Sequence, residues 1–204
     1  MKQFLLAVCF LTCSLFVYSQ QDLINLPAPQ KTGGMPLLET FDKRQSNRQY
    51  TGQELDQQTL SNLLWSAYGF SSRPGGKRTI ATSENKQELE VYVVFKDAAY
   101  YYDATAHQLK LHAKGDFSEA LGQPNVTANV ALSLVYVANV DKASSREACF
   151  IDTGHICQNV YLFCTSAGLG TVARGSFKKP DLYKALKFGE KQEITLVQAV
   201  GQIK

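Results

Sequence analysis

The sequence predicts an α+β protein in which one central sheet is flanked by helices. Strands and helices are intermixed along the chain without a regular βαβ alternation. The run Val130–Ala138 is a continuous β-branched stretch, typical of a strand that is covered on both faces. With 204 residues, 45% of them hydrophobic, the chain is large enough to enclose one core. The net charge of +3 is small and scattered, and it does not favour nucleic acid as a ligand.

Residues 1–19 read as an export signal. A single Lys precedes an apolar stretch from Phe4 to Val17, and Val17-Tyr18-Ser19 predicts cleavage after Ser19. The apolar stretch is too short to span a bilayer. We therefore expect an exported protein, periplasmic or extracellular, with residues 20–38 as a loose Pro- and Gly-containing leader and residues 39–204 as a single domain.

Three cysteines follow the export signal: Cys149, Cys157 and Cys164. An odd number argues against a disulfide framework. Neither these cysteines nor the three histidines have the spacing of a zinc site, so no structural metal is expected.

The first helices are predicted from their ends. Pro36 opens a short helix that runs into the region of Arg44. Asp56 caps a second helix with apolar residues at helical spacing, and Gly69 ends it. The segment "SSRPGGKR", residues 71–78, is expected to be a loop.

Strands dominate the middle of the sequence. Residues 90–96 and 98–103 are expected to flank a tight turn, and residues 108–113 follow as a third strand. The tyrosines of the second strand suit a sheet better than a ligand pocket. A short helix is expected near residues 117–121, ahead of the covered strand Val130–Ala138.

A long apolar helix is expected to begin at Asp152, which would cap it, and to run toward residue 170. A helix that is apolar nearly all round must be buried nearly all round. In a chain of this size the simplest arrangement places it between the sheet and a partner subunit. A helix with Pro180 in its first turn and a strand over residues 193–200 complete the prediction.

Motifs for common catalytic machineries are absent from the sequence. It contains no G-x-S-x-G, no phosphate-binding P-loop and no dinucleotide fingerprint between a strand and a helix. His155 favours a structural role, since no Ser or Cys nucleophile visibly pairs with it. Glu88 and Glu90 are expected on the exposed face of a strand start. The chain therefore indicates either a borrowed cofactor or no catalysis.

The stretch "KRQSNRQY" places Arg44, Ser46 and Arg48 at alternate positions. In an extended segment alternate residues share one side, and in a helix residues four apart do so. Two guanidinium groups with a hydroxyl between them suit a phosphate. The alternative is a solvated basic turn.

A second polar group precedes the first predicted strand of the sheet: Thr82, Ser83, Asn85 and Gln87, after Arg78 and Thr79. Its donors and acceptors can satisfy the edge of a planar heterocycle. The alternative is an ordinary polar turn.

In combination these motifs resemble the nitroreductase superfamily of FMN enzymes. The sequence has, in order, Arg-x-Ser-x-Arg from Arg44, Arg-Thr-x-x-Thr-Ser-x-Asn-x-Gln from Arg78, Asp-x-Gly-His-x-x-Gln-Asn from Asp152, and Arg-Gly-Ser-Phe from Arg174. The resemblance extends from about Glu39 to Gly201. The segment "AAYYYDATAHQL" is similar to the branch that includes the SagB-type, azoline-oxidising dehydrogenases.

The resemblance implies a helix-flanked, mainly antiparallel sheet in an intertwined homodimer with FMN at the subunit interface. Arg44 and Ser46 match positions that hold the FMN phosphate, and Arg48 matches a basic residue near the pyrimidine end of the flavin. The remaining matches are a loop that packs on the isoalloxazine, often the partner's (Thr82, Ser83, Asn85 and Gln87), a backbone stretch near its reactive nitrogen (Gly175 and Ser176), and Lys204 in place of part of a C-terminal basic pair.

The sequence departs from the family pattern at three places. Ala81 stands where Pro is usual, Glu88 and Leu89 stand where Pro and an aromatic residue are common, and Gly175 lacks a preceding Glu.

The function that the resemblance implies is FMN-dependent oxidoreduction, with hydride passing from a reduced donor such as NAD(P)H to an organic acceptor. The flavin would carry the chemistry, so no catalytic side chain is named. Within the same class, a dehydrogenase acting on a peptide or an amine stays open. An exported flavin- or ligand-binding protein of this fold that does not turn over is the alternative.

Overall fold

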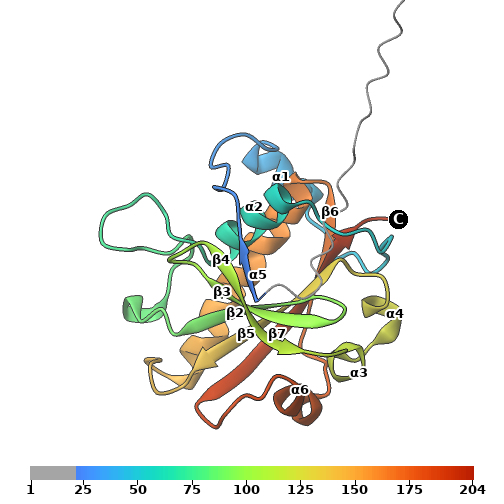
Figure 1. Ribbon diagram of the computed structural model, residues 1–204. Helices are drawn as coiled ribbons and strands as arrows, with labels where there is room; N and C mark the ends of the chain where they lie inside the picture. Colours follow the sequence, from blue (N-terminus) through green and yellow to red (C-terminus); the bar gives the residue numbers. More distant parts are fainter. Residues whose placement is uncertain (1–21) are drawn as a thin grey trace, which may run out of the picture.

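The computed structural model describes residues 22–204, and the expected export signal lies outside these residues. A central sheet runs through the molecule with helices on both faces (Figure 1). The prediction of an α+β fold with a helix-flanked sheet is confirmed.

The sheet has seven strands in the order β1-β4-β3-β2-β5-β7-β6. Every neighbouring pair in it is antiparallel. The strands are β1 (Leu23–Asn25), β2 (Leu89–Val94), β3 (Ala98–Asp103), β4 (Gln108–Lys114), β5 (Leu132–Asn139), β6 (Leu169–Arg174) and β7 (Gln192–Gln202).

Helices cover both faces of this sheet. They are α1 (Leu37–Lys43), α2 (Gln57–Tyr68), α3 (Ser118–Leu121), α4 (Pro124–Thr127), α5 (Arg146–Ser166) and α6 (Lys179–Ala185), together with the short 3₁₀ turn η1 (Ser83–Asn85). The short helix α4 was not predicted, because four residues are too few to give a periodic pattern.

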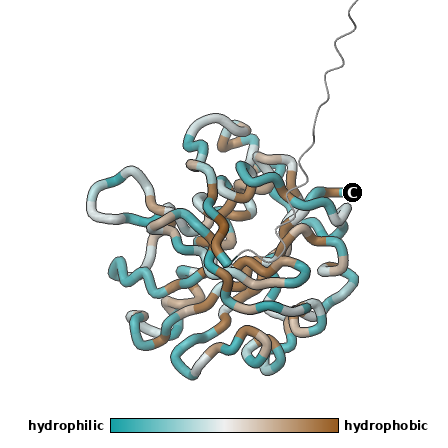
Figure 2. The backbone as a smooth tube through the Cα atoms, viewed as in Figure 1, coloured by the Kyte–Doolittle hydropathy of each residue, from teal (hydrophilic) through white to brown (hydrophobic). Residues whose placement is uncertain are grey.

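Two large apolar clusters fill the space between the layers, and a smaller third one surrounds Tyr50 beside β6 and β7. One of the large clusters lies between the sheet and helices α2 and α5, and the other lies on the opposite face beneath α3 and α6. The hydrophobic residues accordingly gather in the middle of the molecule, while the loops are hydrophilic (Figure 2). Strand β5 is buried along nearly its whole length, as its continuous β-branched sequence predicts.

Helix α2 has the ends that the sequence predicts. The carboxylate of Asp56 accepts a hydrogen bond from the backbone N–H of Thr59 at 2.8 Å, and Gly69 follows the last turn. Its apolar residues face the sheet, so the helix forms one wall of the larger core cluster.

Helix α5 begins six residues earlier than predicted. Ser145 caps it by accepting from the N–H of Ala148 at 3.1 Å. The expectation that Asp152 caps this helix is therefore wrong: Asp152 lies in its second turn and is buried. The sequence misled because Asp is a good capping residue, whereas here its carboxylate serves a loop outside the helix.

The expectation of a loose leader over residues 20–38 is also wrong for the described part of that segment. Leu23–Asn25 form strand β1 against β4, and the Ile24 side chain is buried. Pro and Gly residues around this strand masked it, because three residues are too short for an alternating pattern.

Two findings limit the kinds of site that the described residues hold. No helix within residues 22–204 combines the length and apolarity needed to cross a bilayer. The same residues contain no group of three or more His, Cys, Asp or Glu side chains placed to bind a metal ion. Cys149, Cys157 and Cys164 are free and buried.

Candidate functional site

The first group of predicted residues, Arg44, Ser46, Arg48 and Lys204, is called here the basic cluster. Arg44 directly follows α1, and its guanidinium carbon lies 5.3 Å from the centre of the Tyr161 ring. The Ser46 hydroxyl lies 3.1 Å from the Tyr161 hydroxyl. A single tyrosine of α5 therefore contacts both residues that are predicted to hold a phosphate.

Backbone pairing brings the rest of the basic cluster to the same edge of the sheet. The N–H of Asn47 donates to the carbonyl of Thr171 in β6 at 3.0 Å, and the N–H of Lys204 donates to the carbonyl of Gln49 at 3.4 Å. Lys204 thus pairs next to Arg48. Residues from the two ends of the domain meet at this edge.

The cations of the basic cluster are not neutralised by the protein. Within residues 22–204, no carboxylate lies within ion-pair distance of Arg44, Arg48 or Lys204. The adjacent Lys43, by contrast, pairs with Glu39 one turn earlier in α1. Unpaired guanidinium and ammonium groups beside a hydroxyl form a donor set that fits the phosphate of FMN.

The second group lies in the loop Thr82–Gln87, which is fastened to α5. The N–H of Ser83 donates to the carboxylate of Asp152 at 2.7 Å. Nδ1 of His155 lies 3.0 Å from the carbonyl of Ala81, and because a carbonyl only accepts, Nδ1 carries the proton. This contact agrees with the structural role expected for His155.

Gln87 has its amide engaged inside the loop. Its Oε1 accepts from Nε of Arg78 at 3.0 Å, its Nε2 donates to the carbonyl of Gly76 at 2.9 Å, and its own carbonyl accepts from Lys142 at 2.8 Å. Asn85, with φ of +57°, is exposed at the loop tip. Gln87 therefore shapes the loop, and the side chains of Thr82, Ser83 and Asn85 each accept a hydrogen bond within the protein.

Glu88 lies at the base of this loop and contradicts the expectation of an exposed residue. Its side chain is 2% exposed, and neither carboxyl oxygen has a hydrogen-bond partner within the described residues. Burial raises the pKa of Glu88, and the nearby carboxyl of Asp152 raises it further. This environment therefore favours the neutral form of Glu88.

The third group, Gly175 and Ser176, follows the end of β6 and is exposed. A Cβ added at Gly175 would meet only Cδ2 of Leu196, at 3.7 Å, so a ligand can approach this backbone closely. Arg174 lies beneath, with Nη1 donating to the carbonyl of Leu121 at 3.1 Å, and burial lowers the pKa of its guanidinium.

Helix α5 separates the first two groups within one chain. Asp152, which holds the loop, and Tyr161, which contacts the basic cluster, are nine positions apart in α5. On an α-helix this separation corresponds to about 14 Å along the axis and about half a turn around it. The two groups therefore contact opposite sides of α5 and do not converge in a single chain.

Two cavities flank α5, one of them beside the loop. One, of about 390 Å³, is lined by Thr82, Ser83, Asp152 and His155 among others. A larger one, of about 650 Å³, lies beside Trp65 and Phe163 between α1, α2 and α5. No residue of the basic cluster lines either cavity.

Large apolar side chains are exposed at two places, one on α5 and one on α1. On α5, Phe150 and Ile151 are 39% and 61% exposed, and Gly154 next to them has open space where a side chain would stand. On α1, Leu38 and Phe41 are 81% and 50% exposed. Large exposed apolar side chains on neighbouring elements are typical of an interface.

Sequence reasoning missed three residues that shape the site. Tyr161 reads as one more apolar position of α5, Asp152 reads as a cap, and Glu88 reads as a surface residue. The placement of Glu88 directly before a mostly apolar strand was the one available signal that it could be buried.

Comparison with known proteins places this geometry in a family. The model of the nitroreductase family matches residues 42–202. A Methanocaldococcus jannaschii protein described as a candidate nitroreductase is 29% identical over 170 residues, or 76% of this chain and 85% of the relative. The crystal structure of a candidate nitroreductase from Ralstonia eutropha JMP134 is 33% identical, with a TM-score of 0.85 and coverage of 92% of each chain.

A candidate nitroreductase from Desulfovibrio desulfuricans, crystallised in complex with FMN, shares the fold at 15% identity. Its TM-score is 0.64, and the likeness covers 84% of this chain and 88% of that chain. The four motifs, the antiparallel sheet with helices on both faces and the match over residues 42–202 lead to one conclusion: this chain belongs to the nitroreductase family.

Proposed function

We propose that this protein is an FMN-dependent oxidoreductase that passes hydride from a reduced donor such as NAD(P)H to an organic acceptor. Bound FMN would supply the hydride chemistry, while the chain would supply binding and electrostatics. The observation that carries the proposal is the basic cluster, in which the Ser46 hydroxyl and the Arg44 guanidinium both contact Tyr161 and Arg44 has no carboxylate partner among the described residues.

Different residues would bind different parts of FMN. Arg44, Ser46 and Lys204 would hold the phosphate, and the Arg48 cation would favour negative charge at the pyrimidine end of the ring. Gly175 would let the backbone approach the ring, since little occupies the space beside it.

A homodimer follows from the separation of the two groups across α5. If the loop Thr82–Gln87 packs on a flavin held by the partner's basic cluster, both groups act in one site without converging in one chain. The exposed Phe150 and Ile151 on α5 would then be covered by the second copy.

The substrate class and the compartment are finer proposals. The hairpin of β3 and β4 has the sequence that resembles SagB-type dehydrogenases, which supports, as the alternative within this class, a dehydrogenase that takes hydride from a peptide or an amine. The N-terminal signal supports export to the periplasm or beyond, where FMN would be acquired after translocation.

Purification followed by reduction tests the proposal. We expect yellow protein with FMN absorbance, at one flavin per chain after reconstitution, that bleaches when NADH or NADPH is added anaerobically and regains colour with an acceptor. Yellow protein that no donor bleaches would support the non-catalytic flavin-binding alternative. Protein that cannot take up added FMN would overturn both.

A further inference from the structure

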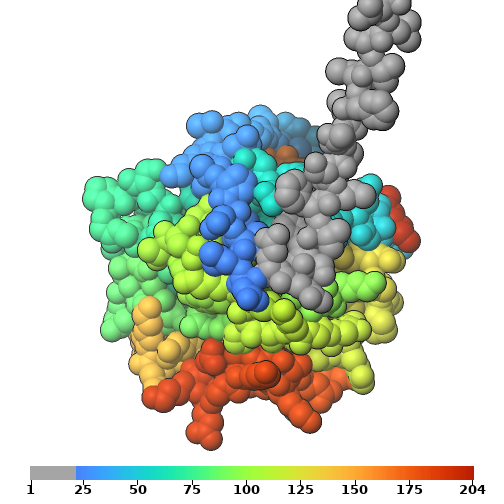
Figure 3. All heavy atoms as spheres, in the orientation of Figure 1, coloured from blue at the N-terminus to red at the C-terminus, as the bar shows by residue number. Residues whose placement is uncertain are grey.

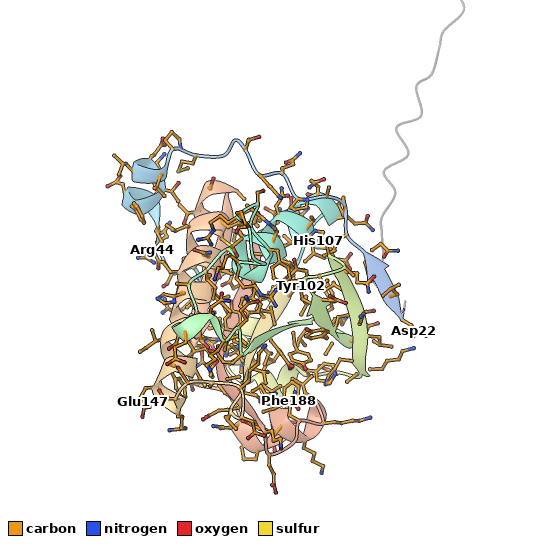
Figure 4. All side chains as sticks on the ribbon, turned by 90° about the vertical axis from the view of Figure 1, so that its left-hand side faces the viewer. Asp22, Arg44, Tyr102, His107, Glu147 and Phe188 are labelled. Atoms are coloured by element: carbon orange, nitrogen blue, oxygen red, sulfur yellow. The ribbon has the colours of Figure 1, made fainter. Side chains whose placement is uncertain are left out.

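Residues 22–36, called here the strap, cross the surface between the sheet and α1. The strap begins as β1 on the outer edge of β4 and passes over α2 to α1, which is directly followed by Arg44 (Figure 4). Its first residues lie on the surface against the β3–β4 hairpin (Figure 3). The family match begins only at residue 42, so the strap precedes the matched region.

A partly buried cluster of polar groups fixes the middle of the strap. The Ser61 hydroxyl donates to the carbonyl of Pro27 at 2.6 Å, and Nε2 of His107 lies 3.1 Å from the same carbonyl and 2.7 Å from the Ser61 oxygen. Since the carbonyl only accepts, Nε2 carries the proton, and Nδ1 accepts from the Tyr102 hydroxyl at 2.9 Å. Figure 4 shows His107 and Tyr102 beneath the strap.

This arrangement, called here the latch, is complete. Each of its polar groups has a partner, and His107 holds a left-handed backbone conformation with φ of +51°. A satisfied buried polar network stabilises one arrangement over its alternatives.

Further contacts fasten the strap on the way to α1. Nε2 of Gln58 donates to the carbonyl of Ala28 at 3.0 Å, and the N–H of Met35 donates to the Ser166 hydroxyl of α5 at 2.8 Å. Gly34, with φ of +88°, is needed beside this second contact, because a Cβ there would lie 2.7 Å from the Ser166 oxygen.

Helix α1 depends on its two ends for its position. It has seven residues, of which only Thr40 is buried, and a helix this short is marginal alone. The strap holds its first residue through Met35, and the Arg44–Tyr161 contact holds its last. Movement of the strap would therefore displace Arg44.

We propose that the strap and its latch, formed by Pro27, Ser61 and His107, position Arg44 and Ser46 for binding of the FMN phosphate. Ser61, in α2, and His107, just before β4, are positioning residues. They do not contact Arg44 or Ser46 but act on them through the strap. The inference rests on the proposed function for the identity of the ligand, but its structural part can be tested without FMN.

Two variants release the latch with little change elsewhere. Ser61→Ala removes the hydroxyl that bonds the Pro27 carbonyl. His107→Asn retains a side chain that tolerates positive φ but is too short for the latch. His112→Ala is the matched control, since it loses a histidine hydrogen bond to the Leu186 carbonyl on the other face of the sheet.

Three measurements on the purified protein report the effect. The fluorescence of Trp65, the single tryptophan, reports strap docking, because the Lys31 ammonium lies 5.7 Å from the centre of its ring. Hydrogen exchange at Asn47, whose N–H is bonded to Thr171, reports the mobility of the basic cluster. FMN titration gives the dissociation constant.

We expect both latch variants to shift Trp65 emission, speed exchange at Asn47 and raise the FMN dissociation constant about 3- to 10-fold, the size of one lost hydrogen bond. His112→Ala should change none of the three by more than about twofold. A shift in Trp65 emission without faster hydrogen exchange at Asn47, or without a change in FMN affinity, would overturn the inference. If exchange rises in the variants but the parent protein binds no FMN, the positioning by the strap stands and the proposed function fails.

Discussion

A few side-chain contacts between distant parts of the sequence define the candidate site. The hydroxyl of Tyr161 accepts from the N–H of Ala173 in β6 at 3.0 Å and also meets Ser46, so this one group joins α5, β6 and the basic cluster. The carboxylate of Asp152 plays the same part for the loop through Ser83. At the scale of residues, the loss of one of these oxygen atoms would therefore separate parts of the site.

Glu88 makes stability depend on pH. Its raised pKa means that the folded protein binds the proton more tightly than the unfolded chain does, so its contribution is full below about pH 4 and is lost as pH rises through the raised value. The groups facing it are Asp152 and Cys149 of α5 and Lys142, which lowers the pKa in part. Glu88→Gln stays neutral at every pH and can donate to Asp152.

We expect Glu88→Gln to match the parent protein at pH 4 and to exceed its free energy of unfolding by about 1–3 kcal/mol at pH 8, measured by urea denaturation. Glu84→Gln, an exposed substitution in the same loop, should follow the parent at both pH values. Equal stabilities of Glu88→Gln and the parent at pH 8 would contradict this account.

Arg44 provides a direct test of the phosphate assignment. Arg44→Ala should weaken FMN binding about 10- to 100-fold, because a charge-assisted hydrogen bond is lost, and should leave the fold intact. Lys43→Ala is the control, since Lys43 is the neighbouring cation but is paired with Glu39 in α1. Titration of apoprotein with FMN measures both. Equal affinities of the two variants would remove Arg44 from the phosphate site.

The sequence could identify donor residues but not their partners. Alternate basic positions with a central hydroxyl mark Arg44, Ser46 and Arg48 as a group, because that pattern is local. The contact with Tyr161 depends on how α5 packs against β6, which no local pattern encodes. Likewise, the burial of Glu88 depends on α5 covering the start of β2.

At the scale of elements, α5 organises the molecule. One side of it fills the core against the sheet, two other sides hold the loop and the basic cluster, and its outer side is left exposed. That outer side has Ile151 next to Gly154, where the absence of a side chain permits close approach of another helix.

Ile151→Glu tests whether this outer side is a dimer interface. A charge placed in an apolar interface is costly to bury, so we expect a shift from dimer to monomer in sedimentation velocity at micromolar concentration. Val140→Glu, at an apolar surface position that is 37% exposed beyond β5, should leave the dimer intact. A dimer unaffected by Ile151→Glu would place the interface elsewhere.

Elements with clear ends or strong periodicity were predictable. Asp56 and Gly69 delimit α2, strand β3 occupies the predicted residues 98–103, and the β-branched run gives β5. The start of α5 was missed because Ser145 and Asp152 are both plausible caps, and only the packing of Ala148 and Cys149 into the core decides between them. Strand β1 was missed because its partner is more than 80 residues away.

At the scale of the whole molecule, the first described residues already belong to the central sheet, because they form β1. Strand β1 starts at Leu23, three positions after the residue that would follow cleavage at Ser19. A signal removed at that point leaves the strap complete, whereas removal several residues later would delete β1.

Expression with the natural N-terminus tests this arrangement. We expect the exported protein to begin at Gln20 in intact-mass and N-terminal sequencing measurements. A mature chain that begins beyond Asn25 would lack β1 and contradict both the cleavage site and the role of the strap.

The position of β7 has a consequence for when this protein can fold. The strand is formed by residues 192–202, yet it lies inside the sheet between β5 and β6. Until these residues have left the ribosome, β6 has no neighbour in the sheet and β5 lacks one of its two. A nascent chain therefore cannot close its core early, and contacts of such long range also form slowly. If the chain is exported as we propose, this delay would keep it unfolded during translocation, and the native structure would form after translocation.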